Sequence, residues 1–184
     1  KEDISICDKF ENQIYTDRCY RMVAESIENS LICDKIQNQF DKDNCYLNVA
    51  KDFSICNKIR DELFKIRCCM DIGKYKGDIS VCNKIEEQQY KDFCYEGVSE
   101  SKSDISICDQ IQSQNSKNAC YLNVAIAKED ISICDKIDDQ VGVNWCYTKV
   151  AIAKKDNSTC DKIDDQYHKD VCYDLVAKTN GTNQ

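Results

Sequence analysis

Fifteen of the 184 residues are cysteine, and their spacing decides which chemistry they could carry. Zinc and iron–sulfur sites take cysteine ligands two to four residues apart, commonly beside histidine. Here fourteen cysteines form seven pairs, each separated by twelve positions, which favours disulfides over metal or haem ligands, so we expect no metal and no cofactor. The pairs are Cys7-Cys19, Cys33-Cys45, Cys56-Cys68, Cys82-Cys94, Cys108-Cys120, Cys134-Cys146 and Cys160-Cys172.

The other residues capable of catalysis are single or repeated. His168 is the only histidine, and no serine or cysteine nucleophile is marked out beside it. Carboxylate pairs such as Asp138-Asp139 and Asp164-Asp165 recur at equivalent positions, and the latter pair with Asp161 lacks the spacing and glycine of an EF-hand. Because an active site is normally a single place, repetition favours a structural cause. We expect no catalytic residue and a protein that is not an enzyme.

These cysteines belong to a repeat of 26 residues, with one step of 23. Relative to the first cysteine, Asp or Asn stands four before, Ile or Phe three after, Gln or Glu six after, and Tyr thirteen after in six of the repeats. Apolar positions three and four apart predict two helices of about ten residues per repeat, capped by Asp or Ser as in Ser5-Ile6-Cys7-Asp8, with a turn near the Gln. The fold class is therefore all-α, an α-solenoid of seven disulfide-stapled helical hairpins.

The array spans residues 1–177, and a polar C-terminal tail follows over 178–184. The repeated tyrosine either packs between hairpins or forms a binding ladder, and its place beside the staple favours packing. The predicted repeats are about 1–26, 27–49, 50–75, 76–101, 102–127, 128–153 and 154–177.

Two disulfide pairings are compatible with the grid. A bridge could join the two cysteines of one repeat, or the second cysteine to the first of the next repeat. The distance within a repeat is always twelve, whereas the distance between repeats is normally fourteen and falls to eleven from Cys45 to Cys56. A bridge has a short covalent reach, so the constant distance favours pairing within repeats.

Cys69 is the one cysteine outside the grid, and it stands where the other six repeats have tyrosine. Three interpretations are open: a buried free thiol, an intermolecular disulfide, or a bridge that uses Cys69 in place of Cys68. A spare cysteine in a secreted chain raises the second interpretation, and the small, apolar character of a thiol favours the first.

Two local patterns carry a resemblance to known repeats. The words Ile-Cys-Asp-Lys-Ile at residues 32–36 and Cys-Tyr-x-x-Val-Ala at 45–50 resemble cysteine-containing hairpin repeats of secreted archaeal proteins. Helix pairs in tandem are similar to α-solenoids of the tetratricopeptide and Sel1-like class, although the repeat is shorter and lacks their Trp, Gly and Pro signature. The resemblance implies a location outside the cell more than an activity.

Composition excludes several kinds of partner. The net charge is −8 with no basic cluster, which argues against nucleic acid and against an anionic membrane surface. No apolar run is long enough for a membrane span. Paired cysteines at fixed spacing predict an oxidising, extracellular or cell-surface location, with hyperthermophile cytosol as the exception. The chain opens in repeat register, so either a leader has been removed or the chain is part of a longer array.

The first repeat lacks the polar face that usually caps a solenoid, since Ile4, Ile6, Phe10 and Tyr20 follow the internal pattern. We therefore expect a non-enzymatic extracellular structural protein, a filament or cell-surface subunit that self-associates head to tail. The alternative is a secreted monomeric solenoid that binds an extracellular protein or glycan. Asn157 and Asn180 begin acceptor patterns for N-glycosylation.

Overall fold

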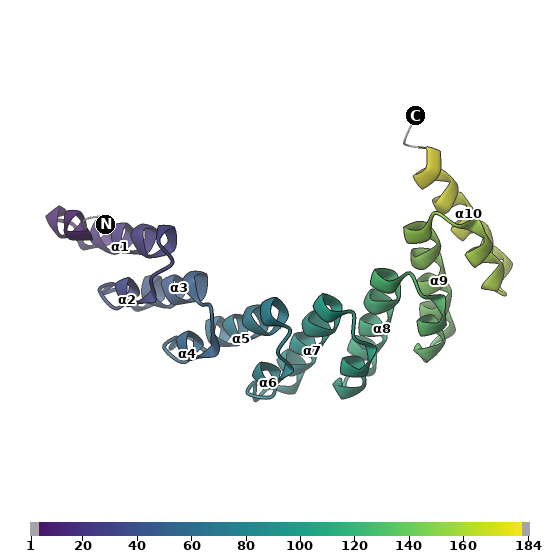
Figure 1. Cartoon of the computed structure of the whole chain (residues 1–184), viewed down its shortest axis with the longest axis horizontal. Coiled ribbons are helices and arrows are strands. Elements are labelled where there is room, and N and C mark those ends of the chain that lie inside the picture. Colours follow the sequence, from purple (N-terminus) through teal and green to yellow (C-terminus); the bar gives the residue numbers. More distant parts are fainter. Residues whose placement is uncertain (1–3, 182–184) are drawn as a thin grey trace. The chain divides into compact units, whose positions relative to one another are not determined.

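The computed structural model describes residues 4–181, and within that range every regular element is a helix. Short and long helices alternate along the chain, as Figure 1 shows from the purple to the yellow end. The short elements are η1 (Ile4–Lys9), α2 (Ser30–Cys33), α4 (Phe53–Cys56), α6 (Ile79–Cys82), η2 (Ile105–Gln110), η3 (Ile131–Lys136) and η4 (Asn157–Lys162). The long helices are α1 (Gln13–Ser26), α3 (Gln39–Val49), α5 (Glu62–Lys76), α7 (Gln88–Lys102), α8 (Gln114–Lys128), α9 (Gln140–Lys154) and α10 (Gln166–Gly181).

The chain divides into two compact units, Lys1–Glu86 and Glu87–Gln184. Within each unit a long helix packs against its own short element, against the next short element and against the next long helix. In the first unit α1, α3 and α5 follow one another in this way, and in the second α8, α9 and α10 do so. This is an all-α array of repeated hairpins, the arrangement of an α-solenoid.

The short elements differ from the helices of about ten residues that we expected. Each is a single α-helical turn or six residues of 3₁₀-helix. The Asp or Asn four before the cysteine begins the element, because its side chain accepts the N–H two residues on, at 2.9 Å for Asp78. Elements η2, η3 and η4 end before an extended residue three after the cysteine, such as Ile111, whereas α2, α4 and α6 end at the cysteine itself. Such a short span suits the tighter 3₁₀ hydrogen bonds. The serines expected as alternative caps lie inside the elements instead.

Each long helix begins at the Gln or Glu that recurs six residues after the first cysteine, near the predicted turn. Most of the long helices are followed by a residue in the left-handed conformation. Gly77 and Ser103 are two of these, with φ of 63° and 50°. Helix α3 is the exception, because it stops at Val49 and Ala50 is extended. The 23-residue step therefore removes the last turn of one long helix and its left-handed cap. At the other end of the chain, α10 continues to Gly181, beyond the predicted start of the tail.

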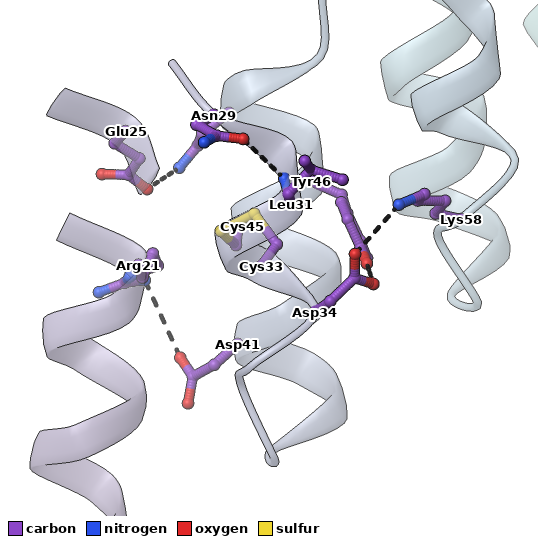
Figure 2. Close-up of a disulfide and its surroundings, with 11 residues drawn as sticks. Arg21, Glu25, Asn29, Leu31, Cys33, Asp34, Asp41, Cys45, Tyr46 and Lys58 are labelled. Carbon is purple, nitrogen blue, oxygen red and sulfur yellow. Dashed lines mark hydrogen bonds and ion pairs between the residues drawn. A yellow bond between two sulfur atoms is a disulfide. The ribbon is translucent and has the colours of Figure 1, made fainter. Parts of the chain in front are cut away.

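The disulfides join cysteines within repeats, the pairing that the constant spacing favours. Cys33–Cys45, with an S–S distance of 2.05 Å, links α2 to α3 in Figure 2. Cys82 and Cys94 are disulfide-bonded as well. The other bridges are Cys7–Cys19, Cys56–Cys68, Cys108–Cys120, Cys134–Cys146 and Cys160–Cys172. The bridged cysteines other than Cys19, and the Ile three after the first cysteine of the six later repeats, are buried in the core.

Candidate functional site

In five of the repeats, the disulfide is accompanied by a tyrosine–aspartate hydrogen bond that was not predicted from the sequence. The repeated tyrosine donates its hydroxyl to the Asp that follows the first cysteine, twelve residues earlier. Tyr121 donates to Asp109 at 2.5 Å, and Tyr46 donates to Asp34 beside the bridge in Figure 2. Burial and the Asp109 carboxylate raise the pKa of Tyr121 to about 12. The rings of Tyr20, Tyr46, Tyr95, Tyr121 and Tyr147 are buried, so they pack inside the array and do not form an exposed binding ladder.

Neighbouring repeats are joined by a buried carboxylate two residues before the second cysteine, which we name the backbone clamp. Asp17 accepts the N–H groups of Gln37 and Asn38, in the turn of the next repeat, at 3.0 and 2.9 Å. Its side chain is held by Gln13 Nε2 at 2.8 Å, and the residue is only 1% exposed. Burial would raise the pKa of Asp17, but these three hydrogen bonds outweigh burial and lower it.

The same clamp recurs in both compact units. Asp43 accepts the N–H groups of Arg60 and Asp61, and Asp92 accepts those of Gln112 and Ser113. Asn118 uses its amide instead, donating to Asp138 and Asp139 of the next repeat. The available signal was Asp or Asn at this position in six of seven repeats.

Lysines of the next repeat add a third type of contact between repeats. Lys35 Nζ lies 5.4 Å from the ring centroid of Tyr20, and Lys58 Nζ lies 5.3 Å from that of Tyr46. Lys58 also reaches Asp34 at 3.2 Å, as Figure 2 shows. A lysine over an aromatic ring is favourable by about 0.5–1 kcal/mol at exposed sites. The contact between repeats thus combines apolar packing, a backbone clamp and a cation over a ring.

The first hairpin leaves its half of this contact open. Phe10 is 49% exposed and Ile6 is 56% exposed. The isoleucines that occupy the position of Phe10 in the six later repeats are at most 6% exposed. We call the surface formed by Ile6 and Phe10 the head face. It has the apolar character of the surfaces that the preceding repeat covers elsewhere in each compact unit.

A groove lies where α3 stops short, beside the C-terminal ends of α1 and α5. Its volume is about 720 Å³. Leu47 and Ile72 contribute apolar surface, while Glu28, Lys51 and Tyr75 lie among its polar and aromatic lining. Tyr75 is 86% exposed, and Glu28 pairs with Lys51. This groove breaks the periodicity of the array, because it follows from the one shortened step.

Cys69 is a buried free thiol, 3% exposed, in the third repeat. The bridge is Cys56–Cys68, so the interpretation in which Cys69 replaces Cys68 is wrong. This repeat also has Asn57 in place of the tyrosine-binding Asp and Ile66 in place of the clamp. Lys84, which would lie over the missing tyrosine, lies 3.8 Å from the ring centroid of Phe53 instead. A cavity of about 240 Å³ lies among these side chains.

We expect Cys69 to resist thiol reagents in the folded protein, because burial raises the pKa of its thiol and hides the sulfur. Titration with DTNB without reductant should show less than about a tenth of one thiol in native buffer and one in guanidinium chloride. A Cys69→Ser variant should show none in either solvent. Rapid labelling of the native protein would contradict the buried placement.

The remaining predicted site residues have structural roles. His168 accompanies Asp165 at the start of α10, with Nδ1 at 2.6 Å from the carboxylate. Asp161 binds the hydroxyl of Tyr173, and no group of three potential metal ligands occurs among residues 4–181. Asn157 is exposed at the start of η4. The pattern that begins at Asn180 reaches Thr182, outside the described residues.

The fold and its contacts define a class of protein, an all-α array of disulfide-stapled hairpins. Comparison with protein-family models, with curated proteins and with solved structures found no match to this chain. The likeness to tetratricopeptide, Sel1-like and archaeal repeats therefore stays a prediction. Within residues 4–181 no helix has the length and apolar character needed to cross a bilayer. The many disulfides fit a secreted or extracellular protein.

Proposed function

We propose that this chain is a non-enzymatic extracellular structural protein that assembles head to tail into a filament or cell-surface array. The observation that carries the proposal is the head face, with Phe10 49% exposed where later repeats bury the equivalent residue. A second copy can cover this face as a preceding repeat covers its neighbour. Such a contact joins two different surfaces, so it is open-ended and builds a filament unless the rotation closes a ring.

The chemistry of the repeat supports a structural function. The repeated carboxylates and tyrosines that could take part in catalysis are bonded to each other or to backbone N–H groups, as in Tyr121 with Asp109 and Asp17 with Gln37. Seven staples suit an oxidising medium, because each repeat of about 26 residues can bury only a small core of its own.

We expect the purified chain to form species that lengthen as concentration rises, and Phe10→Glu to weaken this association at least about 10-fold. The added charge would be buried against the second copy without a partner. Sedimentation velocity and negative-stain electron microscopy over a concentration series measure the effect. Circular dichroism checks that the variant is folded, which the half-exposed position of Phe10 favours.

Tyr75→Ser is the matched control, since it removes an exposed aromatic ring that lies outside the head face. The control should assemble like the wild type. A wild-type chain that stays monomeric at high concentration would overturn the proposal. So would association that Phe10→Glu leaves unchanged.

The groove favours a second candidate function, a secreted monomeric solenoid that binds a protein or glycan. Its volume of about 720 Å³ is in the range of ligand sites, and its lining combines apolar residues with an exposed aromatic ring and polar side chains. It is also a single, non-repeated place, as a binding site normally is. A wild-type chain that is monomeric at every concentration would favour this function over assembly.

A further inference from the structure

The last repeat keeps a backbone clamp that has no neighbour within residues 4–181. Gln166 Nε2 donates to Asp170 at 2.8 Å, as Gln13 does to Asp17 and Gln39 does to Asp43 at the same distance. Asp17 and Asp43 are buried by the next repeat, whereas Asp170 is exposed. The carboxylate is therefore held in place by the same glutamine before any backbone N–H reaches it.

The first hairpin carries the turn that such a clamp binds. In internal repeats the bound N–H groups belong to the two residues before the repeat Gln or Glu, for example Gln37 and Asn38. The equivalent residues are Glu11 and Asn12, which are exposed. Asn12 caps α1 just as Asn38 caps α3, with an extended backbone in both cases. Within residues 4–181 neither Glu11 nor Asn12 donates its N–H to an acceptor.

A lysine and a tyrosine match across the two ends as well. Lys35, Lys58 and Lys136 each lie over the repeat tyrosine of the preceding hairpin. Lys9 stands at the same position in the first repeat and is exposed. Tyr173 is the repeat tyrosine of the last hairpin, and its hydroxyl is bonded to Asp161. Each side of the internal contact is thus present at one end of the chain.

We propose that Asp170 of one copy clamps the backbone N–H groups of Glu11 and Asn12 of a second copy. Lys9 of that second copy then lies over Tyr173 of the first. This inference rests on the proposed head-to-tail assembly and names the surface that meets the head face. It makes the contact between molecules a copy of the contact between repeats, so the partner is a second copy of this chain.

Complementation between two variants tests the pairing of the ends. Phe10→Glu spoils the head face and leaves the Asp170 end intact, while Asp170→Ala does the reverse. Each variant alone should associate about 10-fold or more weakly than wild type. Phe10→Glu would bury a charge without a partner, and Asp170→Ala would leave two N–H groups without a charged acceptor. An equimolar mixture should form 1:1 dimers and no longer species, measured by sedimentation velocity and mass photometry.

Asp174→Ala is the control, since this neighbouring carboxylate on α10 pairs with Lys178 on the exposed surface. It should assemble like the wild type. If Asp170→Ala also assembles like the wild type, the clamp is overturned while head-to-tail assembly stands. A mixture that extends beyond dimers would overturn the proposed pairing of ends. A monomeric wild type would instead overturn the proposed function itself.

Discussion

Removing one staple with the double substitution Cys33→Ala and Cys45→Ala should lower the free energy of unfolding of its hairpin by about 3 kcal/mol. The bridge spans twelve positions and links buried sulfurs of α2 and α3. Closing a loop of this size removes conformational entropy from the unfolded chain by about that amount. Helices as short as α2 and α3 are marginal alone, so the constraint is a large part of what holds them. Denaturation in guanidinium chloride, followed by circular dichroism, measures the change.

Cys69→Ala is the matched control for the staple. It truncates a buried cysteine of the same compact unit that forms no bridge. The expected loss is roughly 1 kcal/mol, from apolar burial alone. Equal unfolding midpoints for the double variant and the control would show that the cross-link itself contributes little. Full reduction opens every bridge and should abolish the cooperative helical signal.

Asp17→Ala should cost about 3 kcal/mol, a second large effect. The substitution leaves the N–H groups of Gln37 and Asn38 without the charged acceptor that the buried Asp17 supplies. An unsatisfied buried donor costs about 1–3 kcal/mol. The loss should appear as a lower unfolding midpoint of the first compact unit, measured by chemical denaturation.

Asp170→Ala offers an internal control in the same chain. Asp170 is bonded to the equivalent glutamine of its own repeat, but it is exposed and binds no turn of a next repeat within residues 4–181. At concentrations where the chain is monomeric, its loss should stay within about 0.5 kcal/mol. Comparable destabilisation by the two substitutions would mean that the clamp does not depend on the next repeat.

The Asp17 clamp also predicts the direction of acid sensitivity. The hydrogen bonds hold the pKa of Asp17 below its ordinary value, despite the opposing effect of burial. A depressed folded-state pKa gives stability that is complete above the unfolded value of about 3.9 and is lost as pH falls through the folded value. Below about pH 4 the wild type should therefore lose stability more steeply than Asp17→Asn.

The sequence was sufficient for the parts of the fold that repeat along the chain. The constant distance from Cys33 to Cys45 beside the variable distance to Cys56 predicted the pairing of cysteines, because covalent reach tolerates little change. The recurring Gln, such as Gln39, lies about midway between the two cysteines of a repeat and so predicted the turn between the helices. The length of the short elements was overestimated, since capping by Asp104 and the extended backbone at Ile111 leave room for only six residues of helix.

The contacts between repeats could not be predicted in the same way. Asp17 and Asp164 are both aspartates in polar stretches of the repeat, so the sequence alone does not distinguish their roles. Only packing shows that Asp17 lies against backbone N–H groups about twenty residues away. The partner of Tyr121 was hidden for another reason, because Asp109 also fits the pattern of an exposed helix residue. The groove beside Tyr75 follows from a deletion whose position was visible, but its volume depends on where α3 unwinds.

The burial of Cys69 has a consequence for the order in which the disulfides form. When Cys69 is set aside, bridges such as Cys7–Cys19, Cys33–Cys45 and Cys56–Cys68 join cysteines that follow one another along the chain, so the hairpins can be oxidised one after another from the N-terminus. An accessible Cys69 would disturb this order, since it could form a non-native disulfide with Cys82. Each later cysteine would then be left to pair with the wrong partner. Once α5 has folded, Cys69 is buried and its thiol is no longer accessible to the other cysteines. The native pairing within repeats is then favoured.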